Sequence, residues 1–496
     1  MLSGTRSSSN SITFLLNRAA TSKRICRRGY STKLPTSELP QPRLDYRAIS
    51  ENTTSKSLNA LNRKARLPHD TAASVARSYT EWKRISAELN AKRNGRSAVG
   101  EKIRRSANDT EREAAMAEAS ALKAEVKHLE ATLEAAEQEC FLSALALPND
   151  THPNTPLGPE SAAVTISTHG PHPLPADPKR DHVTICDHFD LLDLKSGSTV
   201  TGTSWYFLRN EAACLELALT NYALSIAVQY GFTPVTTPDV VRSDIAIRCG
   251  FQPRDNADPP VSHMYHITPA NPSSPELILA GTSEIPLAGM FANKVFSSLS
   301  LPLKVVGVGH AFRSEAGARS ADTRGLYRVH QFTKVELFAV TSEDASEGMM
   351  EEMLSVQRSI LQGLSLPLRV LDMPTEELGA SAYRKYDIEA WMPGRGSWGE
   401  VSSLSNCTDY QSRRLHIRYR PQGNASDSPP ARLPFAHTLN GTAAAIPRLI
   451  VALIENGAVF DDKGEVVVLR LPRALRRFWI GDENRKIVQW DDEVVN

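Results

Sequence analysis

The fold is decided by two neighbouring stretches, Phe312-Arg313-Ser314-Glu315 and Arg328-Val329-His330-Gln331-Phe332-Thr333-Lys334-Val335-Glu336. They predict two strands joined by a loop rich in Gly, Arg and Ser. Because side chains alternate along strands, we expect Arg313, Glu315, Phe332 and Glu336 to project from one face. Arginine, carboxylates and an aromatic ring together suit a nucleotide and an amino acid bound side by side. The alternative is a surface β-hairpin with ordinary cross-strand charge pairs.

Composition sets the broad class of the protein. A chain of 496 residues is too long for one core, so two or three domains are expected. The formal net charge of +1 means that any RNA contact must come from local basic patches. The six cysteines contain no C-x-x-C pair, which argues against a disulfide framework or zinc ribbon and fits a reducing compartment. His182, Cys186 and His188 lack a fourth ligand at usable spacing, so we interpret them as structural residues.

The N-terminal composition indicates targeting. The first 37 residues carry seven Lys or Arg, many Ser and Thr, and no acidic residue before Glu38. Such a segment is typical of a mitochondrial transit peptide, which we predict over residues 1–34, with the matrix as the destination. The alternative is a tail without targeting meaning. The apolar run 12–16 is too short for a membrane span and no apolar stretch of 18 residues follows, so no membrane contact is expected.

Residues 35–147 predict an N-terminal domain with a helical arm over about 70–147, where proline is absent between Pro68 and Pro148. Residues 94–100, which begin Asn-Gly-Arg-Ser and end at Gly100, indicate a chain reversal between two antiparallel helices. The second helix carries a coiled-coil seam formed by Leu122, Val126, Leu129, Leu133, Ala136 and Cys140. The predicted tip is basic and suits phosphate contacts through Lys92, Arg93, Arg96, Lys102, Arg104 and Arg105. The alternative is a dimerisation or spacer element.

The remainder predicts an α+β domain. Eight prolines within residues 148–178 indicate a linker or extended crossing over 148–180. From 181 to 496, amphipathic helix patterns alternate with short apolar strands, which favours a mainly antiparallel sheet. Segments 250–275 and 421–430 predict surface loops. Neither a G-x-x-x-x-G-K-[ST] loop nor a G-x-G-x-x-G after a strand is present, so kinase and dehydrogenase interpretations have no anchor.

The segment from Phe312 to Glu336 resembles the second signature motif of the class II aminoacyl-tRNA synthetases, and its ending from His330 to Glu336 resembles the form found in seryl enzymes. The resemblance covers roughly residues 45–485. Further elements resemble the family in chain order: motif 1 at 231–238, with Pro238 at the family's dimer interface, T-x-E at 282–284, E-V-S-S at 400–403, where the family has E-I-S-S, and motif 3 from 438 to Arg448. One departure is the Ala-Ala-Ala-Ile-Pro run before Arg448, because Pro447 is compatible with a helix only near its start.

The resemblance implies a class II synthetase fold and a homodimeric serine–tRNA ligase that uses ATP, Mg²⁺, L-serine and tRNA(Ser) in mitochondrial translation. It implies serine contacts from Thr282, Ser283, Glu284, Arg313, Glu336, Asn440 and Thr442. It implies ATP contacts from Arg313, Ser314, Glu315, Val329, Phe332, Glu400, Val401, Ser402, Ser403 and Arg448. Within these sets Arg313 and Arg448 would be catalytic, and Glu400 and Ser403 would hold Mg²⁺. The arm's basic residues would contact tRNA.

Two other functions share this resemblance. A catalytically inactive RNA-binding or regulatory paralogue would keep the fold but usually loses ATP or serine ligands, whereas the implied ligands remain in this sequence. An enzyme that transfers serine to a carrier protein would have no need of the long arm.

Overall fold

The computed structural model describes residues 38–251, 263–268, 271, 274–315, 324–422, 432–482 and 485–491. Residues 35–496 form one unit. The predicted transit peptide 1–34 lies outside the described residues, as do the loop segment 316–323 and much of the expected loops 250–275 and 421–430.

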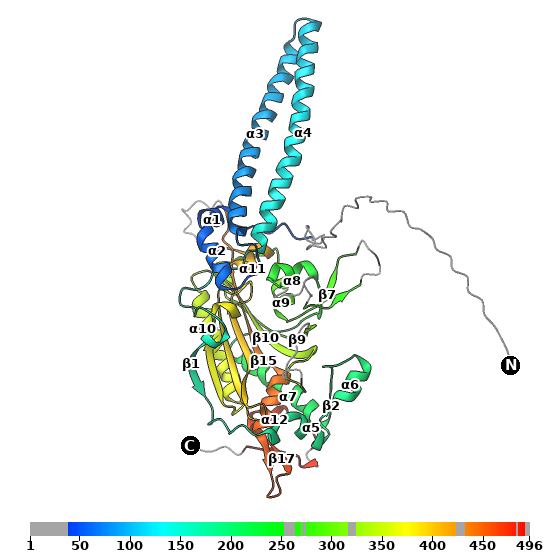
Figure 1. The fold of residues 1–496 in the computed structure, drawn as a ribbon, viewed down its shortest axis with the longest axis vertical. Coiled ribbons are helices and arrows are strands. Elements are labelled where there is room, and N and C mark those ends of the chain that lie inside the picture. Colours follow the sequence, from blue (N-terminus) through cyan, green and yellow to red (C-terminus); the bar gives the residue numbers. More distant parts are fainter. Residues whose placement is uncertain are drawn as a thin grey trace, which may run out of the picture. The chain divides into compact units, whose positions relative to one another are not determined.

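An eight-stranded sheet forms the centre of the structure, with the strand order β1–β11–β12–β13–β15–β10–β9–β4. Its pairs are antiparallel except β4 with β9, which confirms the α+β class. The strands are β1 Val164–His169, β4 Thr233–Thr236, β9 Leu303–Phe312, β10 Gln331–Thr341, β11 Leu368–Asp372, β12 Arg384–Met392, β13 Ser397–Asn406 and β15 His437–Ala445. β10 lies between β9 and β15 and brings the segments that resemble motifs 2 and 3 together (Figure 1).

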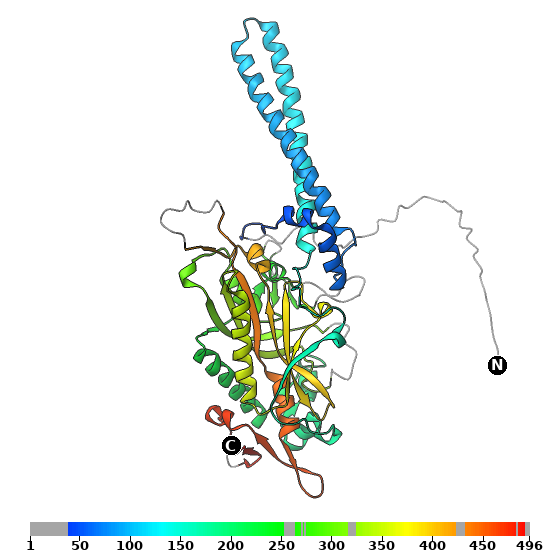
Figure 2. The ribbon, with the colours of Figure 1, turned by 90° about the vertical axis from the view of Figure 1, so that its left-hand side faces the viewer.

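Helices cover both faces of this sheet. The main core packs α7, α10 and α12 against one face, and α8, α9 and α11 contribute to a second cluster on the other. Figure 2 shows α10, in yellow-green, lying against the strands. The helices outside the arm are α1 Tyr46–Glu51, α2 Thr53–Asn62, α5 His182–Phe189, α6 Leu194–Val200, α7 Asn210–Gln229, α8 Ser243–Cys249, α9 Glu284–Met290, α10 Ser346–Gln362, α11 Tyr410–Leu415 and α12 Ile446–Gly457.

Smaller sheets complete the described structure. They pair β2 Leu192–Asp193 with β3 Phe207–Leu208, β8 Val295–Ser297 with β14 Arg418–Arg420, β5 Val240–Arg242 and β6 His266–Ile267 with β7 Leu277–Leu279, and β16 Ala458–Phe460 and β18 Val488–Trp490 with β17 Val466–Leu471.

By length and composition, α7 could cross a membrane, contrary to the expectation that no segment is apolar enough. Apolar residues of α7 pack inside the protein: Leu215, Leu219 and Tyr222 are buried in the main core. A helix that is apolar on most sides is also what a core position requires. One such helix is therefore weak evidence for a membrane span.

The predicted arm is confirmed as two long antiparallel helices, α3 Thr71–Arg105 and α4 Asp109–Ala146, which lie side by side in blue and cyan (Figure 1). Val126 and Cys140 of the predicted seam are buried, and the other seam residues are partly buried. The seam follows the heptad spacing that holds paired helices together.

The chain reversal predicted at residues 94–100 is wrong. α3 continues through Gly95 and Gly100, and the turn lies at residues 106–108. A glycine inside a helix costs about 1 kcal/mol, but Val99 between the two glycines is buried, which indicates that packing in the arm offsets this cost. The reversal occurs where Asn108 caps α4 by accepting a 2.9 Å hydrogen bond from the Glu111 backbone N–H.

The segment 148–180, predicted as a linker or extended crossing, supplies the edge strand β1, which pairs with β11. At its beginning, Asn149 donates from Nδ2 to the backbone oxygens of Ser381 (2.8 Å) and Cys407 (2.9 Å). The segment therefore holds the end of the arm against the sheet rather than acting as a free spacer.

Candidate active site

The β9–β10 hairpin is present, with Phe312 opposite Gln331. Along β10 the odd-numbered Val335, Leu337 and Ala339 are buried in the main core. Because a strand alternates its faces, Phe332, Lys334 and Glu336 project from the opposite face. The same strand thus anchors the fold on one side and presents polar chemistry on the other.

A cavity that is open to solvent lies on this polar face. It combines cationic, anionic and aromatic side chains from the hairpin, β13, β15 and the start of α12. Its lining residues are Arg313, Glu315, Leu326, Tyr327, Arg328, Val329, Phe332, Lys334, Glu400, Ser403, Thr442, Ala445, Pro447 and Arg448.

Two β-bulges shape the cavity wall. In β13 the pairing with β12 skips Val401, so Glu400 and Ser403 both line the cavity although they are an odd number of positions apart. In β15 the pairing with β10 skips one residue after Thr442, and Thr442 and Ala445 share the wall in the same way. A bulge adds one residue to a strand and re-aims the side chains beyond it.

The cationic part of the cavity contains two arginines. Burial and the neighbouring Arg448 lower the pKa of Arg313, whose guanidinium lies 5.3 Å from the centre of the Phe332 ring. Arg448 donates from Nη1 to the backbone oxygen of Glu400 at 2.9 Å and lies 3.4 Å from its carboxylate. Burial acts to lower the pKa of Arg448 as well, but Glu400, Tyr327 and Glu315 raise it. Two guanidinium groups beside one cavity form a site suited to a polyanion.

Glu400 is held ionised. Burial by itself would raise its pKa, but Lys385, Arg448, Arg313 and Lys334 lower it to about 2. An ionised carboxylate beside the Ser403 hydroxyl is an oxygen-donor pair of the kind that Mg²⁺ prefers.

Beside the cavity lies a buried acidic pocket. Glu284 and Glu336 have exposed fractions of 8% and 1%. Burial and the nearby Glu336 raise the pKa of Glu284 to about 7, although Lys334 and Gln411 oppose the shift. Burial also raises the pKa of Glu336, with Lys334 opposing.

Lys334 balances only one of these charges. Its Nζ lies 2.6 Å from the Glu336 carboxylate and donates to the Thr282 hydroxyl at 3.1 Å. Two carboxylates and one ammonium group leave the pocket with an unmatched negative charge when both carboxylates are ionised. The pocket can therefore accept one more cation, such as the ammonium group of an amino acid.

The structure brings most of the implied serine residues together. Asn440 donates from Nδ2 to the Glu284 carboxylate at 3.0 Å, and the hydroxyls of Thr442 and Ser403 lie 3.3 Å apart. Thr282 joins through Lys334. Ser283 is buried, and its hydroxyl lies 3.5 Å from that of Thr237.

Among the described residues, three implied ATP residues do not line the cavity. Val401 is the bulged residue and is buried in the main core. Ser402 is buried, and its hydroxyl donates to the Thr442 backbone oxygen at 2.6 Å. Ser314 donates its backbone N–H to the His263 oxygen at 3.1 Å. For Val401 and Ser402, whose side chains are occupied elsewhere, a contribution to a ligand site would have to come from the backbone.

Other residues were not recognised from the sequence. Lys334 could have been, because it alternates with Phe332 and Glu336 on one strand face. Gln411 donates from Nε2 to Glu284 at 2.6 Å, and Arg328 pairs with Glu315 at 2.7 Å. The contact between Gln411 and Glu284 joins distant segments, so spacing along the chain carried no signal for it, whereas Arg328 and Glu315 belong to the two stretches of the predicted hairpin.

The Ala-Ala-Ala-Ile-Pro run before Arg448, which departs from the family's motif 3, is compatible with the start of α12. Pro447 is the second residue of α12, where its missing N–H has no helical partner to lose. Arg448 follows on the first turn and reaches the cavity.

On the arm, the predicted basic residues form ion pairs. Lys92 pairs with Glu125 at 2.6 Å, Arg93 with Glu130 at 2.8 Å and Lys102 with Glu118 at 3.3 Å, all from α3 to α4. Arg104 and Arg105 both pair with Glu101, whereas Arg96 is exposed. Exposed pairs contribute only about 0–1 kcal/mol each, so a phosphate can replace the carboxylate at low cost.

Comparison with known families matches both parts of the chain. The model of the seryl-tRNA synthetase N-terminal domain matches residues 44–151. The model of the tRNA synthetase class II core domain (G, H, P, S and T) matches residues 265–457.

Individual relatives agree. The mitochondrial serine–tRNA ligase of Schizosaccharomyces pombe is 40% identical over 83% of this chain and 84% of its own length. The mitochondrial serine–tRNA ligase of Saccharomyces cerevisiae is 44% identical over 68% of this chain and 72% of its own length. Among solved structures, seryl-tRNA synthetase from Pyrococcus horikoshii complexed with ATP superposes with a TM-score of 0.76 at 31% identity, covering 88% of this chain and 98% of that one.

Proposed function

Because this chain belongs to the seryl-tRNA synthetase family of class II aminoacyl-tRNA ligases, we propose that it activates L-serine with ATP and transfers the seryl group to tRNA(Ser). The observation that carries this proposal is one continuous site in which a cavity with two arginines adjoins a buried acidic pocket. The arginines suit a triphosphate, and the acidic pocket suits an amino acid's ammonium group.

The acidic pocket would hold serine. Glu284 would receive the ammonium group, since Gln411 and Asn440 already orient its carboxylate. Glu336 would accept the hydrogen bond of the serine hydroxyl, with Thr442 beside it. Alanine lacks this donor and would leave a buried carboxylate unsatisfied, which costs on the order of 1–3 kcal/mol or more.

The cavity would hold ATP, with the adenine on Phe332 and its amino group donating to Glu315. Arg313 would hold the serine carboxylate against the α-phosphate, and Arg448 would hold the γ-phosphate. The carboxylate oxygen then attacks the α-phosphorus, seryl-adenylate forms and pyrophosphate leaves. The protein contributes positioning and charge stabilisation, and no side chain acts as a nucleophile.

Glu400 and Ser403 would hold Mg²⁺. The bulge at Val401 puts both oxygen donors on the cavity wall, and the low pKa of Glu400 keeps it ionised, so these residues fit the ion. Bound Mg²⁺ would neutralise charge on the ATP phosphates. Serine activation that persists at full rate in EDTA would contradict this assignment.

The test of the function is ATP–pyrophosphate exchange by the purified chain with each amino acid supplied in turn. Exchange should occur with serine, and alanine and threonine should be rejected. Silence with all twenty amino acids would instead favour a non-catalytic RNA-binding protein.

Serine activation should depend on pH through Glu284. Its pKa of about 7 in the free pocket means that it is protonated, and unable to pair with an ammonium group, at lower pH. For a single group of this pKa, kcat/KM for serine should fall about tenfold from pH 8 to pH 6. Exchange kinetics measured across this range should show this fall in kcat/KM. Glu284→Gln should lower the activity and remove its dependence on pH in this range. An unchanged pH dependence in that variant would refute the assignment.

Import into the mitochondrial matrix is supported by the basic composition of residues 1–37 and by the mitochondrial relatives. A fusion of residues 1–40 to a fluorescent protein should accumulate in mitochondria, and a diffuse cytosolic signal would contradict this.

We also propose a homodimer. The edge strand β4 and the neighbouring exposed residues Val228 and Tyr230 offer a surface for a second copy. Sedimentation at the mass of one chain, 54.4 kDa, would contradict it.

A further inference from the structure

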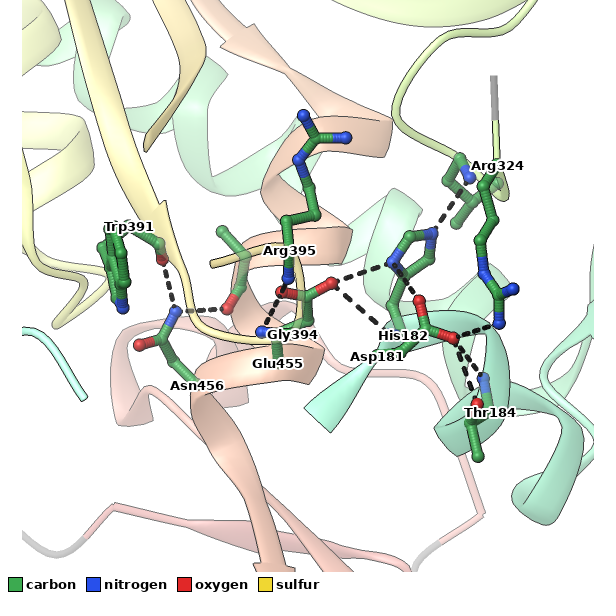
Figure 3. Close-up of polar contacts among 11 residues, drawn as sticks. Asp181, His182, Thr184, Arg324, Trp391, Gly394, Arg395, Glu455 and Asn456 are labelled. Carbon is green, nitrogen blue, oxygen red and sulfur yellow. Dashed lines mark hydrogen bonds and ion pairs between the residues drawn. The ribbon is translucent and has the colours of Figure 1, made fainter. Parts of the chain in front are cut away.

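A polar cluster of Asp181, His182 and Glu455 lies next to Leu326, one of the residues that line the cavity (Figure 3). The exposed fractions of His182 and Glu455 are 2% and 0%. His182 Nδ1 lies 2.9 Å from Glu455 Oε1, and the Leu326 backbone N–H donates to His182 Nε2 at 3.2 Å. Since Nε2 accepts, a neutral ring carries its proton on Nδ1 and donates it to Glu455.

The three side chains could in principle surround a metal ion, but the protein itself uses their atoms. Glu455 Oε2 accepts from the backbone N–H groups of Gly394 (2.8 Å) and Arg395 (3.1 Å). Asp181 Oδ2 accepts from Arg324 at 2.8 Å and caps α5 through the Thr184 N–H at 3.2 Å. Both ring nitrogens of His182 and both carboxylate oxygens of Glu455 therefore have partners within the protein. Such a hydrogen-bond network indicates a structural role, in which it holds separate chain segments together.

The segments that meet here also build the ATP cavity. Leu326 is followed by Tyr327, Arg328 and Val329, all of which line the cavity. Glu455 lies seven residues after Arg448 on α12, which places both on the same helix face two turns apart. Arg448 Nε donates to the Tyr327 backbone oxygen at 3.2 Å. The segment 324–329 is therefore tied to α12 twice, once directly at Arg448 and once through His182 at Glu455.

Two glycines show how tightly the segments approach. A Cβ added at Gly325, whose φ is +65°, would lie 2.1 Å from His182 Nε2. One added at Gly394 would lie 2.5 Å from the Arg180 backbone oxygen. Contacts this short leave room only for glycine. The His182 imidazole is therefore held in one position between the segment at Gly325 and α12.

We propose that His182 is a positioning residue for ATP in serine activation. By joining Leu326 to Glu455 it sets the distance between the loop end that carries Arg328 and Val329 and the helix that carries Arg448. This inference rests on the proposed function, and it concerns binding of the nucleotide rather than of serine, because the serine pocket is built from α9, β10, β15 and α11.

The test is ATP–pyrophosphate exchange by His182→Ala. KM for ATP should rise about tenfold or more, while KM for serine should stay within about twofold. His182→Asn can still donate to Glu455 but cannot reach Leu326, so it should give an intermediate KM for ATP. The matched control is His188→Ala, an exposed histidine on the same helix, which should leave both constants unchanged.

Gly325→Ala tests the position of the His182 ring independently. Its methyl group should displace the ring and also raise KM for ATP. In the double variant with His182→Ala the two effects should combine to less than their product, because the ring that the methyl group strikes is absent. Multiplicative effects would contradict the contact.

The outcomes separate the two proposals. If the unmodified chain does not exchange pyrophosphate with serine, the proposed function fails. If it does, and His182→Ala and His182→Asn lower only the melting temperature while KM for ATP is unchanged, His182 is merely structural and the inference is overturned.

Discussion

Arg313→Ala should slow serine activation about a thousandfold while the chain remains folded. Arg313 lines the cavity beside Phe332 and Arg448, at the junction between the acidic pocket and the triphosphate site. It would contact both the attacking carboxylate and the α-phosphate, so its loss removes positioning and charge stabilisation together. Loss of one preorganised donor to developing charge typically slows a reaction on the order of 10²–10³-fold, and we expect the upper end of that range in pyrophosphate exchange.

The free protein should tolerate this change. Burial and the neighbouring Arg448 lower the pKa of Arg313 although Glu400, Glu315 and Glu336 oppose the shift, so removing this charge should not destabilise the ligand-free protein. The melting temperature of Arg313→Ala without ATP should equal or exceed that of the unmodified chain. Arg313→Lys is the matched control, since it keeps the charge but loses the planar fork that binds two oxygens at once, and it should recover only part of the activity. Near-normal exchange by Arg313→Ala would contradict its assignment.

The sequence was informative where chemistry and strand period coincide. Phe332 and Glu336 were expected on one face from their spacing alone, and β10 presents that face to the cavity. The bulges could not be foreseen, because alternation puts Glu400 and Ser403 on opposite faces unless one residue is skipped. The continuous α3 was missed for a related reason. Gly95 and Gly100 indicate a break locally, whereas pairing with α4 decides the outcome.

Contacts between distant segments were also beyond sequence reasoning. His182, Leu326, Gly394 and Glu455 come from four separate parts of the chain, and no local pattern marks any of them as a neighbour of the others. The same holds for Gln411, which reaches Glu284 from α11. Such residues hold the recognised motifs in register, and only the fold reveals them.

Shortening the arm should separate serine activation from tRNA charging. The arm's basic residues lie along α3 from Lys92 to Arg105, distant in the chain from the cavity residues. Both helices must be shortened together, because deletion of residues 90–105 alone would leave the apolar seam of α4, including Val126, without its partner. Lys92 and Glu125 form a cross-helix pair of 2.6 Å, so residues 93–124 can be replaced by a short Gly/Asn turn between them.

Pyrophosphate exchange by this truncated chain should stay within about twofold of normal, since the serine and ATP sites are intact. In contrast, kcat/KM for tRNA(Ser) should fall about a hundredfold or more, because phosphate contacts and their counterion release are lost.

The matched control keeps the arm and changes only Arg96, Lys102, Arg104 and Arg105 to Ala. If these residues touch phosphates, each substitution should lower the salt dependence of tRNA binding by about one unit of slope. Equal loss of exchange and charging in the truncated chain would show that the arm supports the catalytic fold. Unchanged charging would show that it is a spacer.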